Sequence, residues 1–84
     1  DMKEKFILFC KPTCPFCVSA VDLLEESGLD YSVINFEPGE ERLLQEVKDA
    51  YNWRTVPIVL SVTEGGMNLI GGHDSLVEFL GRND

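Results

Sequence analysis

The sequence has little of what marks a membrane or nucleic-acid-binding protein. Its 84 residues contain no long apolar run; the longest is far shorter than the roughly 20 residues that a helical membrane span needs. Basic residues are few: seven Lys and Arg stand against 15 Asp and Glu, for a formal net charge of −8. Nucleic acid and anionic lipid attract basic surfaces, so this charge argues against either as a partner.

Cysteine is also scarce. The chain holds three cysteines, and an odd number argues against a small secreted scaffold held together by disulfides. We therefore expect a reducing, cytoplasmic location. A chain of this length has room for one hydrophobic core, so we expect a single domain over residues 1–84.

Two of the cysteines stand in a Cys-Pro-Phe-Cys motif at residues 14–17. The apolar run 6–10 before it predicts a buried strand over Lys5–Cys10, and the amphipathic segment 15–27 predicts a helix. Pro15 suits the first helical turn, which places Cys14 at or next to the N-cap. A Cys-x-x-Cys motif at a strand-to-helix junction is typical of a thiol–disulfide redox site.

The two positions predict different roles. A thiolate at a helix N-terminus meets unpaired N–H groups and the positive end of the helix dipole, and Lys11 adds a positive charge. These favour ionisation of Cys14, which we predict to be the attacking nucleophile. Cys17, one turn further in, would stay protonated and resolve a mixed disulfide. A pair of buried cysteines or a permanent disulfide is the alternative.

The rest of the chain predicts alternating strands and helices. Strands are predicted over 31–35, 58–62 and 67–70, and helices over about 40–51 and from about 74 to Gly81. The strand 31–35 reads as buried, and its spacing from the first strand predicts a parallel βαβ unit. A turn at 64–66 predicts a hairpin. In the last helix we expect Leu76, Val77 and Leu80 to face inward and Gly81 to end the helix.

Together these features resemble glutaredoxin, the dithiol branch of the thioredoxin-like superfamily. Three motifs carry the resemblance: the cysteine motif with Lys11 before it, Thr-Val-Pro at 55–57, and Gly-Gly-His-Asp at 71–74. The resemblance implies an α/β thioredoxin-like fold, βαβαββα, with a four-stranded mixed sheet flanked by helices. It also implies glutathione-dependent thiol–disulfide oxidoreductase activity, which reduces protein disulfides and glutathione mixed disulfides.

The resemblance implies a glutathione site as well. Pro57 matches the family's cis-proline, and Val56 matches the residue whose backbone pairs with the cysteinyl part of glutathione, as an added strand would. Phe16 would form an aromatic wall of the active site. The other implied contacts are Lys11 and Arg54 at the glycyl carboxylate, Thr55 beside Val56, and Gly72, His73 and Asp74 at the γ-glutamyl end.

Plainer alternatives stay open for several residues. Arg54 would also fit as a solvated surface charge, and Asp74 as the N-cap of the last helix. We read Trp53 as a residue that packs at a helix end. Cys10 reads as a small buried apolar residue, with a regulatory thiol as its alternative.

The resemblance implies glutathione as co-substrate, with no tightly bound cofactor and no metal. Disulfide or glutathionylated proteins would be the partners of a monomer. Two alternatives stay open: a dimer bridged by an iron–sulfur cluster that acts as carrier or sensor, and a redoxin recycled by a flavoprotein reductase. Cys17 argues against the first, because dedicated carriers of this type usually have one active-site cysteine. Lys11, Arg54 and Asp74 argue against the second.

Overall fold

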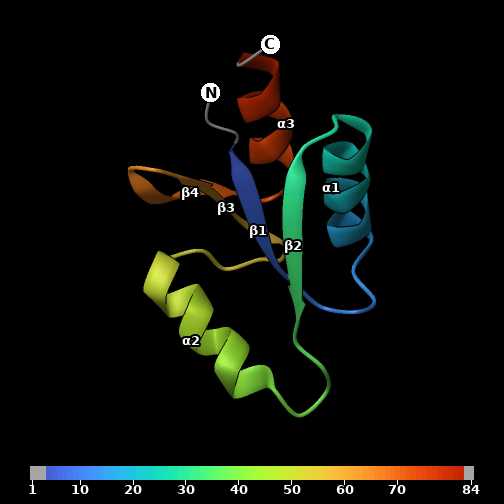
Figure 1. Cartoon of the computed structure of the whole chain (residues 1–84). Coiled ribbons are helices and arrows are strands. Elements are labelled where there is room, and N and C mark those ends of the chain that lie inside the picture. The colour runs from blue at the N-terminus through green and yellow to red at the C-terminus, as the bar shows by residue number, and fades with distance from the viewer. Residues whose placement is uncertain (1–3, 83–84) are drawn as a thin grey trace.

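The computed structural model describes residues 4–82, so the ends of the expected 1–84 domain, 1–3 and 83–84, lie outside the described residues. Strands and helices follow in the order βαβαββα, which confirms the expected order (Figure 1). Their bounds are β1 Lys5–Cys10, α1 Pro15–Glu26, β2 Asp30–Asn35, α2 Glu41–Tyr51, β3 Ile58–Thr63, β4 Gly66–Gly71 and α3 His73–Arg82.

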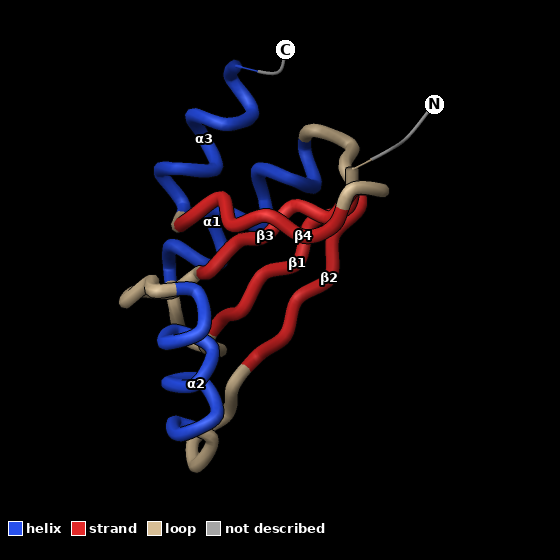
Figure 2. Tube along the Cα trace, turned by 90° about the vertical axis from the view of Figure 1, so that its left-hand side faces the viewer, coloured by secondary structure: helices blue, strands red, loops and turns tan. Residues whose placement is uncertain are grey.

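The strands form one mixed sheet in the order β2-β1-β3-β4. β1 runs parallel to β2 and antiparallel to β3, and β3 and β4 form the expected hairpin. Parallel neighbours need a crossover connection, which α1 supplies. Helices α1 and α3 lie together on one face of the sheet, whereas α2 lies on the other side (Figures 1 and 2).

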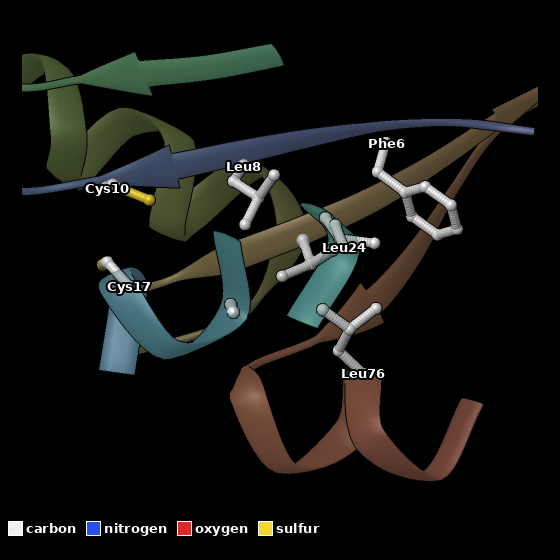
Figure 3. Close-up of a cluster of buried hydrophobic side chains, with 8 residues drawn as sticks. Phe6, Leu8, Cys10, Cys17, Leu24 and Leu76 are labelled. Carbon is white, nitrogen blue, oxygen red and sulfur yellow. The ribbon is translucent and has the colours of Figure 1, made fainter. Parts of the chain in front are cut away.

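The core lies between the sheet and the helices α1 and α3 (Figure 3). Residues two apart in a strand share a face, and β1 follows this rule: Phe6, Leu8 and Cys10 are all buried on the helix side. On the opposite face, Phe9 lies with its ring centroid 6.3 Å from that of Tyr51 in α2. This alternation places the end of β1 between the two helical layers, next to the start of α1.

The expectation that the second strand is buried was wrong. β2 lies at the edge of the sheet, where Val33 and Ile34 are 39% and 43% exposed. An apolar run indicates a strand but does not determine its position in the sheet. Because β3 pairs with the other side of β1, β2 has β1 as its single neighbouring strand within residues 4–82.

The inward face of α3 also differs from the prediction. Leu76 is buried and Leu80 packs against the core as expected, but Val77 is 48% exposed. Phe79 packs on the core instead, with its ring edge-on to Phe6 at 6.2 Å between centroids. Residues three and four apart share a helix face, which explains why Leu76 pairs with Phe79 and Leu80. The helix also continues through Gly81 to Arg82. Within residues 4–82, no helix is long and apolar enough to cross a bilayer.

Candidate active site

Cys14 is the N-cap of α1, as the sequence predicts. Its backbone is extended, with φ −115° and ψ 109°, and Pro15 follows in the first turn. The backbone N–H of Cys17 donates a hydrogen bond to the Sγ of Cys14 over 3.3 Å. A sulfur in this position therefore has a backbone donor and the positive end of the helix dipole beside it, and both stabilise a thiolate.

Cys17 has a contrasting environment. It is 4% exposed and belongs to the core, whereas Cys14 is partly exposed at its edge. Burial, followed by contact with the Cys14 side chain, raises the pKa of the Cys17 thiol above its ordinary value. Desolvation disfavours the charged form, so Cys17 is a protonated thiol at neutral pH. Both cysteines are free thiols in this structure.

The segment before β3 lies directly beside Cys14. The Val56–Pro57 peptide bond is cis, which confirms the cis-proline implied by the resemblance. The thiol of Cys14 donates a long hydrogen bond of 3.7 Å to the carbonyl oxygen of Val56. A backbone edge 42 residues away in sequence is thereby held against the sulfur.

A groove of about 260 Å³ opens next to this contact. Three segments build it: the start of α1, the loop between α2 and β3, and the start of α3. Its lining residues are Phe16, Trp53, Thr55, Val56, Pro57, Gly72, His73, Asp74 and Ser75. The groove therefore contains residues from all three sequence motifs, and Phe16 is the residue that the cysteine motif contributes.

The start of α3 presents a linked pair of side chains to this groove. The Nδ1 of His73 lies 3.0 Å from the Oδ1 of Asp74, and the His73 ring lies against Phe16 with 5.8 Å between centroids. Phe16 is 61% exposed and so forms a wall of the groove rather than part of the core. Asp74 lies in the first turn of α3, one residue inside its start, and its side chain is 98% exposed. Its carboxylate is thus open to a ligand.

Trp53 is one of two groove residues that sequence reasoning missed. Its ring lies over the two glycines that lead into α3: a Cβ on Gly71 would lie 3.0 Å from its Cη2, and one on Gly72 would lie 3.6 Å from its Nε1. That Nε1 is buried and has no hydrogen-bond partner among residues 4–82. A Gly-Gly pair leaves room for a large ring, which is the signal that could have indicated this contact. Ser75 was missed as well.

The two predicted cations lie elsewhere. Neither Lys11 nor Arg54 is among the described residues that line the groove. Lys11 borders a neighbouring hollow of about 420 Å³ beside the loop before α2, together with Glu37 and Glu41. The pKa of Glu41 is lowered, chiefly by the backbone N–H of Gly39 and to a lesser degree by the charge of Lys11. Arg54 is exposed, directly before Thr55.

No group of three or more His, Cys, Asp or Glu side chains in residues 4–82 is arranged to hold a metal ion. The three cysteines nevertheless lie near one another, because Cys10 and Cys17 share the core cluster against which Cys14 packs.

Comparison with known sequences identifies a family and a curated relative. The glutaredoxin family model matches residues 6–62, more than half of the chain. A hybrid peroxiredoxin of Haemophilus influenzae, hyPrx5, is 35% identical over 79 residues, which cover 94% of this chain and 30% of that protein. The chain therefore spans less than a third of the length of this curated relative.

Comparison with solved structures supports the fold. The solution structure of glutaredoxin from Brucella melitensis matches with a TM-score of 0.69 and 22% identity, over 96% of this chain and 82% of that one. DsbH oxidoreductase matches with a TM-score of 0.50 and 16% identity, over 95% and 71% of the two chains. At these identities the matches establish the thioredoxin-like architecture and leave the substrate to be argued from the site.

Proposed function

The chain belongs to the glutaredoxin family, and we propose that it is a glutathione-dependent thiol–disulfide oxidoreductase whose nucleophile is Cys14. One observation carries the proposal. The sulfur of Cys14 sits at the N-cap of α1 and also contacts the Val56 carbonyl, at a backbone edge that borders an open groove. The reactive sulfur, the backbone edge at Val56 and the groove thus lie next to one another. A small thiol peptide needs the groove for space, the backbone edge for pairing and the sulfur for reaction.

Glutathione has the chemistry to occupy this groove. It is an extended peptide, so its cysteinyl unit can pair with the Val56 backbone as a short added strand. Its γ-glutamyl carboxylate would accept from the backbone N–H groups at the start of α3, and its ammonium would meet the exposed carboxylate of Asp74. Lys11 and Arg54, on the adjoining surface, would approach the glycyl carboxylate.

The reaction follows from the two thiol environments. The Cys14 thiolate attacks one sulfur of a substrate disulfide, so that a mixed disulfide forms and the other sulfur leaves with the electron pair and takes a proton. For a protein disulfide, Cys17 then attacks the Cys14 sulfur, releases the reduced substrate and leaves a Cys14–Cys17 disulfide, which two glutathione molecules reduce as they form glutathione disulfide. For a glutathionylated protein, the first step already releases the reduced protein, and a second glutathione attacks the Cys14–glutathione disulfide, frees Cys14 and leaves as glutathione disulfide. Because Cys17 must lose its proton to attack, its raised pKa favours the glutathione route at neutral pH.

The test compares two electron sources and two substrates. Reduction of a glutathionylated peptide and of a protein disulfide is followed with glutathione, glutathione reductase and NADPH, and separately with a flavoprotein thioredoxin reductase. We expect turnover with glutathione and its loss for both substrates in Cys14→Ser. Cys17→Ser should lose disulfide reduction and keep most deglutathionylation. Ser19→Ala, an exposed change in the same helix, should behave as the wild type.

Two outcomes would contradict the proposal. Turnover with the flavoprotein reductase alone would favour the alternative redoxin. A visible absorbance band after anaerobic iron reconstitution, together with dimer formation and no glutathione-dependent turnover, would favour the cluster-bridged alternative.

We also propose a peroxiredoxin as one protein substrate. The support is the hybrid peroxiredoxin hyPrx5, because a protein named as a peroxiredoxin contains a stretch similar to this chain over about 30% of its length. Glutathione-dependent peroxide consumption by a peroxiredoxin with a single reactive cysteine measures this directly. The chain should accelerate it, and Cys14→Ser should not. A rate equal to that with glutathione alone would remove peroxiredoxin from the substrates.

A further inference from the structure

Cys10 is a thiol that the proposed reaction does not use. It ends β1 and is 1% exposed, and Cys17 enters the same core cluster from α1. Figure 3 shows both side chains directed into the space between strand and helix, at the same end of the core. The two residues also line one hollow of about 300 Å³ between α1 and β2, which is separate from the groove.

Cys17 interacts with two sulfurs rather than one. Side-chain contacts with Cys14 and with Cys10 both add to the effect of burial in raising the pKa of Cys17. Burial likewise raises the pKa of Cys10, although contact with Cys17 opposes the rise. In the core cluster Cys17 thus has both other cysteines beside it, with Cys14 toward the groove and Cys10 at the buried end of β1.

We propose that Cys10 is a second disulfide partner of Cys17, and that the oxidised enzyme can move its disulfide from Cys14–Cys17 to Cys10–Cys17. The inference rests on the redox role proposed for the Cys14–Cys17 pair. In this step the Cys10 thiol gives its proton to water, and its sulfur attacks the Sγ of Cys17. The Cys10–Cys17 bond forms, the Cys14–Cys17 bond breaks, and the electron pair stays on Cys14. The exchange is an isomerisation, so it needs no oxidant or reductant.

The environments of the sulfurs set the direction of this exchange. Cys14 leaves as a thiolate that accepts the Cys17 N–H at the start of α1, whereas a thiolate on Cys10 would be desolvated in the core. The better-stabilised thiolate is the better leaving group. Burial also makes the attack by Cys10 slow, because only a small fraction of the Cys10 thiols is ionised at neutral pH. Sustained oxidation should thus convert the enzyme from a dithiol into a monothiol form with Cys14 free.

The first experiment removes Cys14, so it does not depend on catalysis. The full-length Cys14→Ser variant is treated with diamide, a thiol oxidant, and its thiols are counted after acid quenching. We expect the two remaining thiols to disappear in a monomer that has lost the mass of two hydrogen atoms. In the matched control, Cys10→Ser combined with Cys14→Ser, the Cys17 thiol should persist in the monomer. Circular dichroism identifies folded variants, and Cys14→Ala replaces any that fail to fold.

The second experiment follows the wild type. The protein is oxidised with diamide, acid-quenched at intervals, alkylated and mapped by peptide mass. Alkylation should fall first on Cys10 and then shift to Cys14 as the disulfide moves. Retention of both thiols by folded Cys14→Ser, or only intermolecular dimers from it, would overturn the proposal. So would oxidised wild type in which Cys10 remains the alkylated residue at equilibrium. None of these outcomes bears on glutathione-dependent turnover, which is measured separately.

Discussion

Replacement of Gly71 by Ala should have two effects: it should lower the free energy of unfolding and distort the groove. Gly71 is buried at the end of β4 with φ +129°, a conformation that L side chains rarely adopt. An added Cβ would lie 2.5 Å from the Oγ and 2.8 Å from the Cβ of Ser75, and 3.0 Å from the Cη2 of Trp53. Backbone strain of this type costs about 1–3 kcal/mol, and overpacking costs about as much again. The expected loss is thus roughly 2–6 kcal/mol, a large share of the roughly 5–15 kcal/mol that stabilise a domain.

The overlap can be relieved only by movement of Ser75 or Trp53, and both line the groove. We therefore expect a higher KM for glutathione in Gly71→Ala, even at temperatures where the variant is folded. Two controls separate the causes. Gly28→Ala, at φ +71° with no described atom within 4 Å of its Cβ, measures backbone strain alone, about 1–2 kcal/mol. Gly72→Ala, whose Cβ would lie at an ordinary 3.6 Å from Trp53, measures added volume in the groove without overlap.

Urea unfolding followed by circular dichroism measures the three free energies of unfolding. Glutathione-coupled reduction measures KM for the same variants. The reasoning would be refuted if Gly71→Ala lost no more stability than Gly28→Ala, because the contacts with Ser75 and Trp53 would then cost nothing. An unchanged KM in a destabilised Gly71→Ala would separately refute the role of these two residues as walls of the site.

Three further predictions concern charge and titration. Neutralising Lys11 and Arg54 together should raise the KM for glutathione about tenfold or more, since a charge-assisted hydrogen bond contributes about 1.5–3 kcal/mol. Glu46→Gln, on the exposed surface of α2, is the control. Equal effects of the two changes on KM would contradict a local role for the cations. The pKa values of Cys10 and Cys17 are raised, mainly by burial, so the folded state keeps protons that unfolded thiols release above about pH 8.5. The free energy of unfolding should then fall as pH rises further, by up to about 1.4 kcal/mol per pH unit for each thiol; urea titrations at two alkaline pH values should show a smaller fall for Cys17→Ser. Disulfide reduction should accelerate over the same alkaline range, because the attacking form of Cys17 is its thiolate, and a rate that levels off near neutral pH would contradict this.

Several features of the site could be predicted because they depend on neighbours along the chain. Pro15 and the Cys-x-x-Cys spacing act within one helical turn, so the N-cap position of Cys14 was confirmed. The apolar run in β1 is likewise a local feature, and the strand that it predicts is buried at Phe6, Leu8 and Cys10. The cis form of the Val56–Pro57 bond came from the family resemblance, because only a small minority of X–Pro bonds are cis.

Other features depended on contacts between segments far apart in sequence. The run 31–35 has the same composition at the edge of a sheet as in its centre, so only strand pairing decided that β2 is exposed. Trp53 reads as a helix-end residue until α3 brings Gly71 and Gly72 against its ring. The outward position of Lys11 was equally unpredictable, because long charged side chains are placed by whichever surface surrounds them.

The chain sequence by itself thus determined the start of α1, the different positions of its two cysteines in that helix, and the order of strands and helices. Packing alone decided that Trp53 and Ser75 line the groove and that Cys10 meets Cys17 inside the core. The physical reason is range. Capping and periodicity act over a few residues, whereas grooves and thiol contacts require that segments tens of residues apart be brought together by burial of their apolar faces.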